Sequence, residues 1–199
     1  MKKFVKLSLA AAALSAAFTF ASCSNSSDGN NLLIPQATPQ NKIVSEAATT
    51  VTELDFDAAQ VNNKIFSCAG AEGTTYYGFK ERKCYIAEPL GDSSRWTDVS
   101  SKWEGVALAF DALRLFSCQM TRVEGSGLFT RWYDGDQSFI TLYSNGAAKM
   151  FTDGQERDAT FTNANGLITI NCNGKICCGF YDGDYIYMVT NVLAFVKNI

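Results

Sequence analysis

Six Asn-Gly or Asp-Gly dipeptides fall between residues 134 and 183, and they constrain the fold more than any other feature of the chain. They are Asp134-Gly135, Asn145-Gly146, Asp153-Gly154, Asn165-Gly166, Asn173-Gly174 and Asp182-Gly183. Asn, Asp and Gly tolerate the positive φ that a two-residue type I′ hairpin turn requires. The sequence therefore predicts an antiparallel meander over about the last 70 residues.

Short runs of β-branched and aromatic residues flank these turns, and they begin at about Val61. Such runs, bounded by turn residues, are typical of β-strands. The expected strands are residues 64–68, 74–79, 83–87, 105–110, 113–119, 127–133, 138–144, 147–151, 159–163, 166–172, 175–181 and 184–190. A short helix is also expected near residues 46–59, where Thr52 has weak capping character. Apart from that helix, the pattern predicts an all-β fold.

Two-residue turns at Asn173-Gly174 and Asp182-Gly183 would fix the register of the last three predicted strands. In that register Cys177 lies opposite both Ile170 and Met188, and an apolar row of Ile168, Gly179 and Ile186 lies beside them. The other face is more polar and includes Thr169, Asn171, Cys178 and Tyr187. One apolar face and one polar-leaning face predict a sheet that closes over a core.

The N-terminus has the layout of an export signal. Three lysines precede an uncharged apolar run over residues 7–20, and small residues follow it. This run is shorter than the ~20 residues that a membrane-spanning helix needs. Phe20-Ala21-Ser22-Cys23 resembles a bacterial lipobox of the looser kind found in spirochaetes. The resemblance implies that Cys23 is acylated and becomes the first residue of a membrane-anchored surface lipoprotein; a plainly secreted protein is the alternative.

The other six cysteines are Cys68, Cys84, Cys118, Cys172, Cys177 and Cys178. An even number in an exported protein permits up to three disulfides, but free cysteines are also common as small buried side chains. Both interpretations stay open. Cys177 and Cys178 are adjacent on a predicted strand, so they point to opposite faces and are not expected to bond each other.

The overall charge and the missing histidine exclude several classes of function. The chain has 17 basic and 20 acidic residues, and removal of a leader with three lysines and no acid would leave a net charge near −6. Such a charge disfavours nucleic acid as a partner. Without histidine there is no Ser-His-Asp or Cys-His catalysis and no histidine-ligated metal.

Carboxylates are the remaining candidates for chemistry. The pairs Asp134/Asp136 and Asp182/Asp184 offer calcium-type oxygen ligands, but the complete EF-hand pattern is missing and turn residues are the simpler interpretation. Glu81, Glu88 and Glu104 are candidates for an acid/base pair, although their spacing brings no two of them together. No cofactor and no metal site are expected.

Residues 137–190 resemble the lipocalin-like repeats of bacterial surface lipoproteins, which alternate strands with Asn-Gly or Asp-Gly turns. The segment Gly166-Leu167-Ile168-Thr169-Ile170 is similar to a G-x-I-T-I element of those repeats. The Gly-x-Trp signature of true lipocalins is not found in this chain's first predicted strand. The resemblance implies an up-and-down barrel of eight to ten strands that holds side chains or one small apolar molecule.

These observations divide the chain into a leader over residues 1–22, a polar tether over 23–50 and a lipocalin-like β domain over 51–199. We expect a non-catalytic lipoprotein of the bacterial envelope, held at the outer membrane by its acyl chains, on a face that the sequence does not specify. Its partner is expected to be a small apolar ligand or a surface protein, besides the bilayer itself. A carboxylate-dependent hydrolase on a β scaffold is the alternative.

Overall fold

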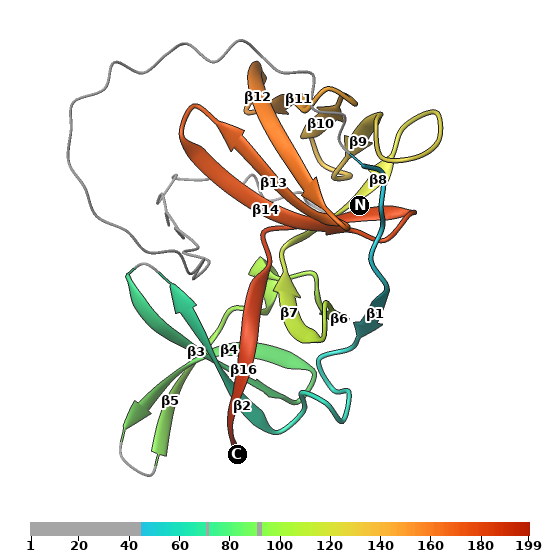
Figure 1. Ribbon diagram of the computed structural model, residues 1–199. Helices are drawn as coiled ribbons and strands as arrows, with labels where there is room; N and C mark the ends of the chain where they lie inside the picture. The colour runs from blue at the N-terminus through green and yellow to red at the C-terminus, as the bar shows by residue number, and fades with distance from the viewer. Residues whose placement is uncertain (1–44, 71, 91–92) are drawn as a thin grey trace, which may run out of the picture.

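The computed structural model describes residues 45–70, 72–90 and 93–199, which form strands, turns and one short 3₁₀ helix. The strands build a closed eight-stranded barrel and an open eight-stranded sheet. The barrel lies above the sheet in Figure 1, and β16 (Asn191–Asn198) runs downward from the barrel through the sheet. The predicted fold class, all-β with an antiparallel meander that closes into a barrel, is confirmed. No helix among these residues is long and apolar enough to span a bilayer.

The barrel is an unbroken up-and-down meander. Its strands are β8 (Cys118–Arg122), β9 (Arg131–Tyr133), β10 (Phe139–Leu142), β11 (Ala147–Thr152), β12 (Gln155–Ala164), β13 (Leu167–Cys172), β14 (Lys175–Tyr181) and β15 (Tyr185–Met188). Each strand pairs with the next along the chain, and β15 pairs with β8 to close the ring. Closure leaves no unpaired edge strand in this part of the molecule.

The open sheet takes strands from both ends of the described chain. These are β1 (Val51–Leu54), β2 (Lys64–Gly70), β3 (Gly73–Lys80), β4 (Lys83–Leu90), β5 (Ser93–Asp98), β6 (Gly105–Ala109), β7 (Ala112–Phe116) and β16 (Asn191–Asn198), with the 3₁₀ helix η1 (Ser100–Lys102) between β5 and β6. Their order is β1-β6-β7-β16-β2-β3-β4-β5. Because β16 pairs with β7, the whole barrel is an insertion between two neighbouring strands of this sheet.

Three of the six predicted turns have the expected two-residue form. Asp153-Gly154, Asn165-Gly166 and Asn173-Gly174 each have two consecutive positive φ values, and the flanking residues pair directly. The expected partnership of Ile170 with Cys177 is found.

The predicted turn at Asp182-Gly183 is displaced by one residue. Asp182 Oδ1 accepts hydrogen bonds from the backbone N–H groups of Asp184 and Tyr185, which makes Gly183 and Asp184 the central residues of the turn. Met188 therefore lies opposite Gly179 rather than Cys177, and Ile186 lies opposite Tyr181. A shift of two positions in pairing leaves each side chain on its expected face.

Other sequence predictions were wrong. Residues 46–59 contain no helix; instead β1 and a series of turns occupy this region. The strand predicted over residues 113–119 breaks at Ser117, where the chain leaves the sheet for the barrel. The strands β1, β5 and β16 were not predicted. Residues 23–44 of the predicted tether, and Cys23 with them, lie outside the described residues.

The described end of the predicted tether runs against the barrel. Asn163 Nδ2 donates hydrogen bonds to the backbone oxygens of Ser45 and Ala47, and the Thr49 N–H donates to the Tyr181 oxygen. Gly166 lies so close to this segment that an added Cβ would be 2.6 Å from the Thr49 nitrogen. Residues 45–49 are therefore bound to the rim of the barrel rather than free.

Among the residues that the structure describes, three clusters of buried side chains hold the molecule together. Side chains of Trp132, Ile140, Ile168, Ile170, Ile186 and their neighbours fill the barrel interior. A second cluster, including Phe66, Phe79, Leu115 and Leu193, packs against one face of the open sheet. A third joins the two parts, with Phe116 of the sheet packed edge-on against Tyr187 of the barrel at a centroid distance of 5.0 Å.

Candidate functional site

An aromatic row crosses the outer face of the barrel. Tyr133 on β9 pairs with Phe139 on β10, which pairs in turn with Phe151 on β11. The Tyr133 and Phe139 rings stack with centroids 4.8 Å apart, and Phe139 meets Phe151 edge-on at 6.2 Å. All three side chains are partly exposed to solvent.

A polar row lies directly beside the aromatic row. In it Arg131, Thr141 and Lys149 pair across the same three strands. Arg131 Nε donates a hydrogen bond to Thr141 Oγ1 at 3.4 Å, and the guanidinium carbon lies 5.7 Å from the centre of the Phe139 ring. Lys149 forms an ion pair with Glu156 on β12.

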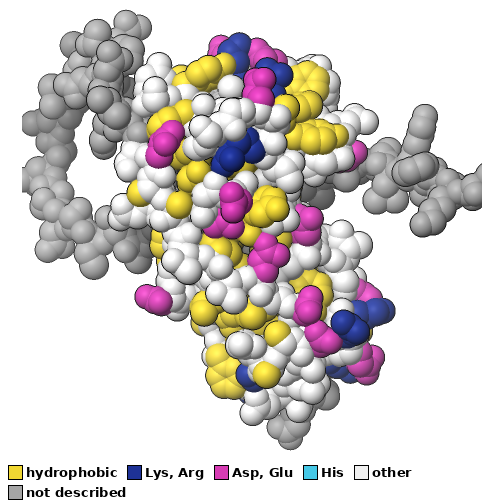
Figure 2. Space-filling model, turned by 90° about the vertical axis from the view of Figure 1, so that its right-hand side faces the viewer, with side chains coloured by type: hydrophobic (Ala, Val, Ile, Leu, Met, Phe, Trp, Pro, Cys, Tyr) yellow, Lys and Arg dark blue, Asp and Glu magenta, His cyan; other side chains and the backbone are white. Residues whose placement is uncertain are grey.

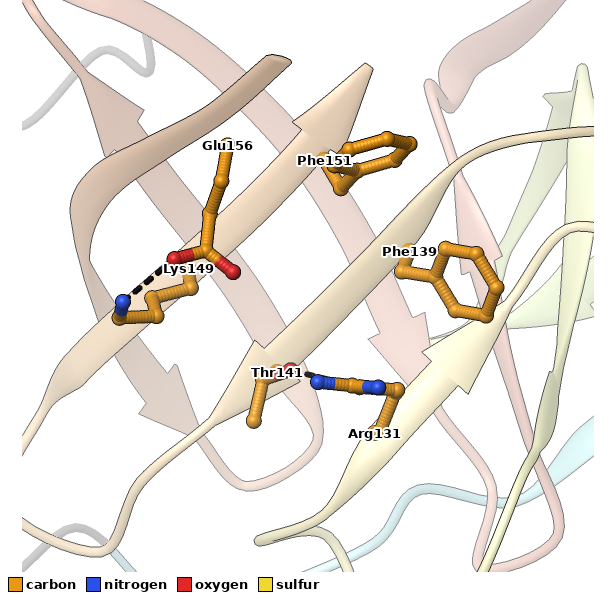
Figure 3. A pocket seen from close by; sticks show the side chains of 6 residues that line it. All are labelled: Arg131, Phe139, Thr141, Lys149, Phe151 and Glu156. Carbon is orange, nitrogen blue, oxygen red and sulfur yellow. Dashed lines mark hydrogen bonds and ion pairs between the residues drawn. The ribbon is translucent and has the colours of Figure 1, made fainter. Parts of the chain in front are cut away.

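The two rows enclose a shallow pocket of about 220 Å³, which we call the outer groove. Its lining residues are Arg131, Phe139, Thr141, Lys149, Phe151 and Glu156. Figure 3 shows the two phenyl rings at one side of the groove, the Lys149–Glu156 pair at the other, and Arg131 beside Thr141 below them. The groove therefore combines an apolar wall with hydrogen-bonding groups.

Strand alternation explains why these side chains point outward. Ile140, Leu142 and Ala148 face the barrel interior and are at most 4% exposed, so the residues between them must face the opposite side. Phe139 and Phe151 are thus not needed to fill the core. Partly exposed aromatic rings in a row are a feature of binding surfaces.

Opposite charges in the outer groove compensate each other. The hydrogen bond between Lys149 and Glu156 raises the pKa of the lysine and lowers the pKa of the glutamate. Asp158, which pairs with Lys149 in the β-ladder, adds a second acidic group beside the two basic residues Arg131 and Lys149. The groove and its rim consequently carry two basic and two acidic groups.

A second pocket, of about 350 Å³, lies where the barrel meets the open sheet. Glu53, Asp55 and Glu104 line it together with Gln119. Glu53 Oε1 accepts hydrogen bonds from the Tyr187 hydroxyl and from Gln119 Nε2, and Glu104 Oε2 accepts one from the Gln119 backbone N–H. Acidic side chains gather across the middle of the face in Figure 2, at this level of the molecule. We call this the junction pocket.

Burial governs the ionisation of Tyr187. Its ring stacks on Phe180 with centroids 4.7 Å apart and is almost completely enclosed. Loss of solvent raises the pKa of the Tyr187 hydroxyl, and its hydrogen bond to Glu53 raises it further. The hydroxyl therefore remains a hydrogen-bond donor that ties the barrel to β1.

The six cysteines that the sequence singled out are free thiols distributed over both parts of the molecule. Cys68 and Cys84 belong to the core of the open sheet, and Cys118 and Cys177 pack against the barrel interior. Burial raises the pKa of Cys84 and Cys118 to about 12 and that of Cys177 to about 11. Cys177 and Cys178 face opposite sides of β14, as expected.

The aspartate pairs act in turns. Asp134 Oδ1 accepts hydrogen bonds from the backbone N–H groups of Asp136 and Ser138, and Asp182 Oδ1 makes the equivalent pair of bonds in its own turn. Among the described residues there is no cluster of three or more potential metal ligands from Cys, Asp and Glu.

The three glutamates considered for acid/base chemistry lie on separate elements. Glu81 is in the β3–β4 turn, Glu88 lies toward the far end of β4 where it pairs with Arg95, and Glu104 precedes β6. Glu104 shares the junction pocket with Glu53 and Asp55, and neither was considered from the sequence.

The sequence indicates only some of the residues that form the outer groove. The cluster Phe129–Tyr133 is conspicuous, but it divides between the two faces: Trp132 is buried in the barrel, whereas Tyr133 stacks outside. Phe139 and Phe151 join the row only through strand pairing, which requires the correct register. Comparisons with protein-family models, curated proteins and solved structures found no match to this chain.

Proposed function

We propose that this protein is a lipid-anchored, non-catalytic binding protein of the bacterial envelope, and that it holds a surface partner in the outer groove. The filled barrel interior is the observation that carries the choice of site. Trp132, Leu128, Ile168 and Ile170 occupy the interior with at most 1% of their surface exposed. A ligand of appreciable size could enter only by displacing close-packed side chains, which is costly.

The outer groove supports surface binding instead. It presents the aromatic rings and the arginine that are enriched where proteins contact partners. It is open to solvent, so a ligand in it would remain partly accessible and could be part of a larger molecule. Of the two partners expected from the sequence, a surface protein thus fits better than a small apolar molecule inside the barrel.

A site-specific crosslinking experiment tests the binding site. A photoreactive phenylalanine analogue replaces Phe151 in the groove, which keeps an aromatic ring at that position, and a matched one replaces Lys102, which is exposed on η1 of the open sheet. We expect crosslinking in cells to capture a discrete partner from position 151 and not from position 102. Identical products from both positions, or none from position 151, would contradict the proposal.

The anchor is tested separately at Cys23. We expect the wild-type protein to incorporate radiolabelled palmitate in its host and to enter the detergent phase on phase separation, and Cys23→Ala to do neither. Cys172→Ala is the matched control and should remain labelled, because Cys172 belongs to strand β13 and Cys23 is unchanged in this variant. Full labelling of Cys23→Ala would contradict the proposed lipid anchor at Cys23.

A carboxylate-dependent hydrolase is the second candidate, and the junction pocket is the observation that favours it. Glycoside hydrolysis needs two carboxyl groups about 5–9.5 Å apart, with one free to donate a proton. Glu53 and Glu104 share the pocket, but both accept hydrogen bonds that join the barrel to the sheet. These contacts support a structural role. Hydrolysis of a chromogenic glycoside that is abolished by Glu104→Gln would restore the enzyme hypothesis.

A further inference from the structure

We propose that the outer groove recognises a neutral sugar ring, so that the partner is a glycan or a molecule that carries one. This inference rests on the proposed function, because it specifies the chemistry of the same site.

The size of the groove suits one ring of a larger ligand. Pockets that enclose drug-sized molecules usually measure ~300–1,000 Å³, whereas the outer groove measures about 220 Å³ and opens to solvent. Strand pairing brings Phe139 and Phe151 side by side to form its apolar wall. A pyranose ring has an apolar face of C–H groups that packs against such rings, while its other positions continue into a chain.

The polar groups of the groove match the hydroxyl groups of a sugar. Arg131 offers guanidinium donors, Thr141 offers a hydroxyl that both donates and accepts, and Glu156 offers carboxylate oxygens as acceptors. Sugar hydroxyls likewise act as donors and acceptors, so each can pair with one of these groups. A purely apolar ligand would cover Arg131 and Lys149 without replacing their contacts with water, which is unfavourable.

The charge of the groove favours a neutral ligand over an anionic one. Arg131 and Lys149 are compensated by Glu156 and Asp158 on β12. The chain as a whole is acidic, with a net charge of −3. A nucleic acid or a sulfated chain needs uncompensated basic groups along its backbone, and these residues do not supply them.

The test measures binding of four neutral probes to the full-length lipoprotein. The probes are the methyl glycosides of glucose, galactose, mannose and N-acetylglucosamine, observed by saturation-transfer NMR in a zwitterionic detergent that contains no sugar headgroup. We expect at least one probe to bind with a Kd of about 1 mM or tighter, and glucose 6-phosphate to bind more weakly than methyl glucoside.

Matched variants assign the binding to the groove. Phe151→Ala and Arg131→Leu remove one apolar and one polar wall, and each should weaken binding about tenfold or more. Ile176→Ala removes an exposed side chain from β14, outside the groove, and should bind as the wild type does. Circular dichroism should show that all three variants retain the β fold.

The result that overturns the inference is absence of binding by all four glycosides, or equal binding by the wild type and both groove variants. If the glycosides fail while crosslinking at position 151 still captures a partner, the sugar inference is refuted and the proposed function stands. If both fail, both are refuted. A glycoside that competes with the crosslink places the sugar on the captured partner, whereas one that binds without competing shows that sugar and partner occupy different sites and overturns the inference.

Discussion

The thiol of Cys84 has no exposed surface, and burial protects it from reaction with solutes. Burial raises the pKa of Cys84 to about 12, so the thiol is protonated at pH 8 and is a poor nucleophile. Cys172 is partly exposed at the end of β13. We therefore expect iodoacetamide at pH 8 to alkylate Cys172 first in the folded protein, and to label all six thiols at similar rates in urea. Peptide mass mapping over time measures this order; rapid alkylation of Cys84 in the folded protein would contradict it.

Asp98 is a second residue whose contribution can be measured, because its effect on stability depends on pH. A hydrogen bond from Lys83 and a further one from the Ser100 backbone lower the pKa of Asp98 from 3.8 to about 2. The ionised form is thus favoured by folding, and its contribution to stability is present above about pH 4 and lost as the pH falls toward 2. The difference in urea midpoint between the wild type and Asp98→Asn should therefore shrink between pH 4 and pH 2. A difference independent of pH over this range would refute the interaction.

Among the strands, β16 holds the two halves of the open sheet together. It pairs with β7 on one side and with β2 on the other. The strand that follows the barrel therefore lies between two strands that precede it. Leu193 on β16 packs into the core of that sheet with 6% of its surface exposed. Leu193→Ala should lower the free energy of unfolding by about 2–4 kcal/mol. Urea unfolding is the measurement.

Val192, the neighbouring residue on β16, provides the control for that substitution. Its side chain points to the opposite face and is 40% exposed. Val192→Ala should change the free energy of unfolding by less than about 0.5 kcal/mol. If the two substitutions had equal effects, β16 would not contribute to the core as described.

Elements with local signals were predictable, and those fixed by distant partners were not. The hairpins joined by Asp153-Gly154, Asn165-Gly166 and Asn173-Gly174 follow from turn chemistry alone. By contrast, β16 has no turn dipeptide before it, and several of its apolar residues, including Phe195, are exposed. Its place beside β7 depends on residues more than 70 positions away in the sequence. The one-residue displacement at Asp182 arises because the carboxylate bonds to Asp184 and Tyr185, an alternative that the dipeptide does not reveal.

The same distinction applies to the outer groove. Tyr133 and Arg131 alternate with the buried Trp132, so their outward position follows from a single strand. Phe151 and Glu156 reach the groove because β11 and β12 pair in one particular register. The sequence shows that aromatic and charged residues are present. Without the strand register, it does not show which of them are adjacent in space.

The whole molecule is two packed bodies with one continuous chain, in which the barrel enters and leaves through neighbouring strands of the sheet. Phe116, Phe180 and Tyr187 form the contact between the bodies, and Tyr187 donates to Glu53 across it. Since the interface covers the outer face of β14 and β15, the outer face of β9 to β12 remains available for a partner. The end of the predicted tether contacts yet another part of the barrel rim, at Asn163 and Gly166.

Native mass spectrometry of the full-length protein, purified from its own host, shows whether the binding site lies outside the barrel. The packed interior around Trp132 and Ile168 leaves no room for a molecule of lipid size. We expect the mass of the processed chain with the acyl groups proposed at Cys23, and no further apolar molecule bound. A lipophilic molecule retained one to one, and released only when the barrel unfolds, would contradict it.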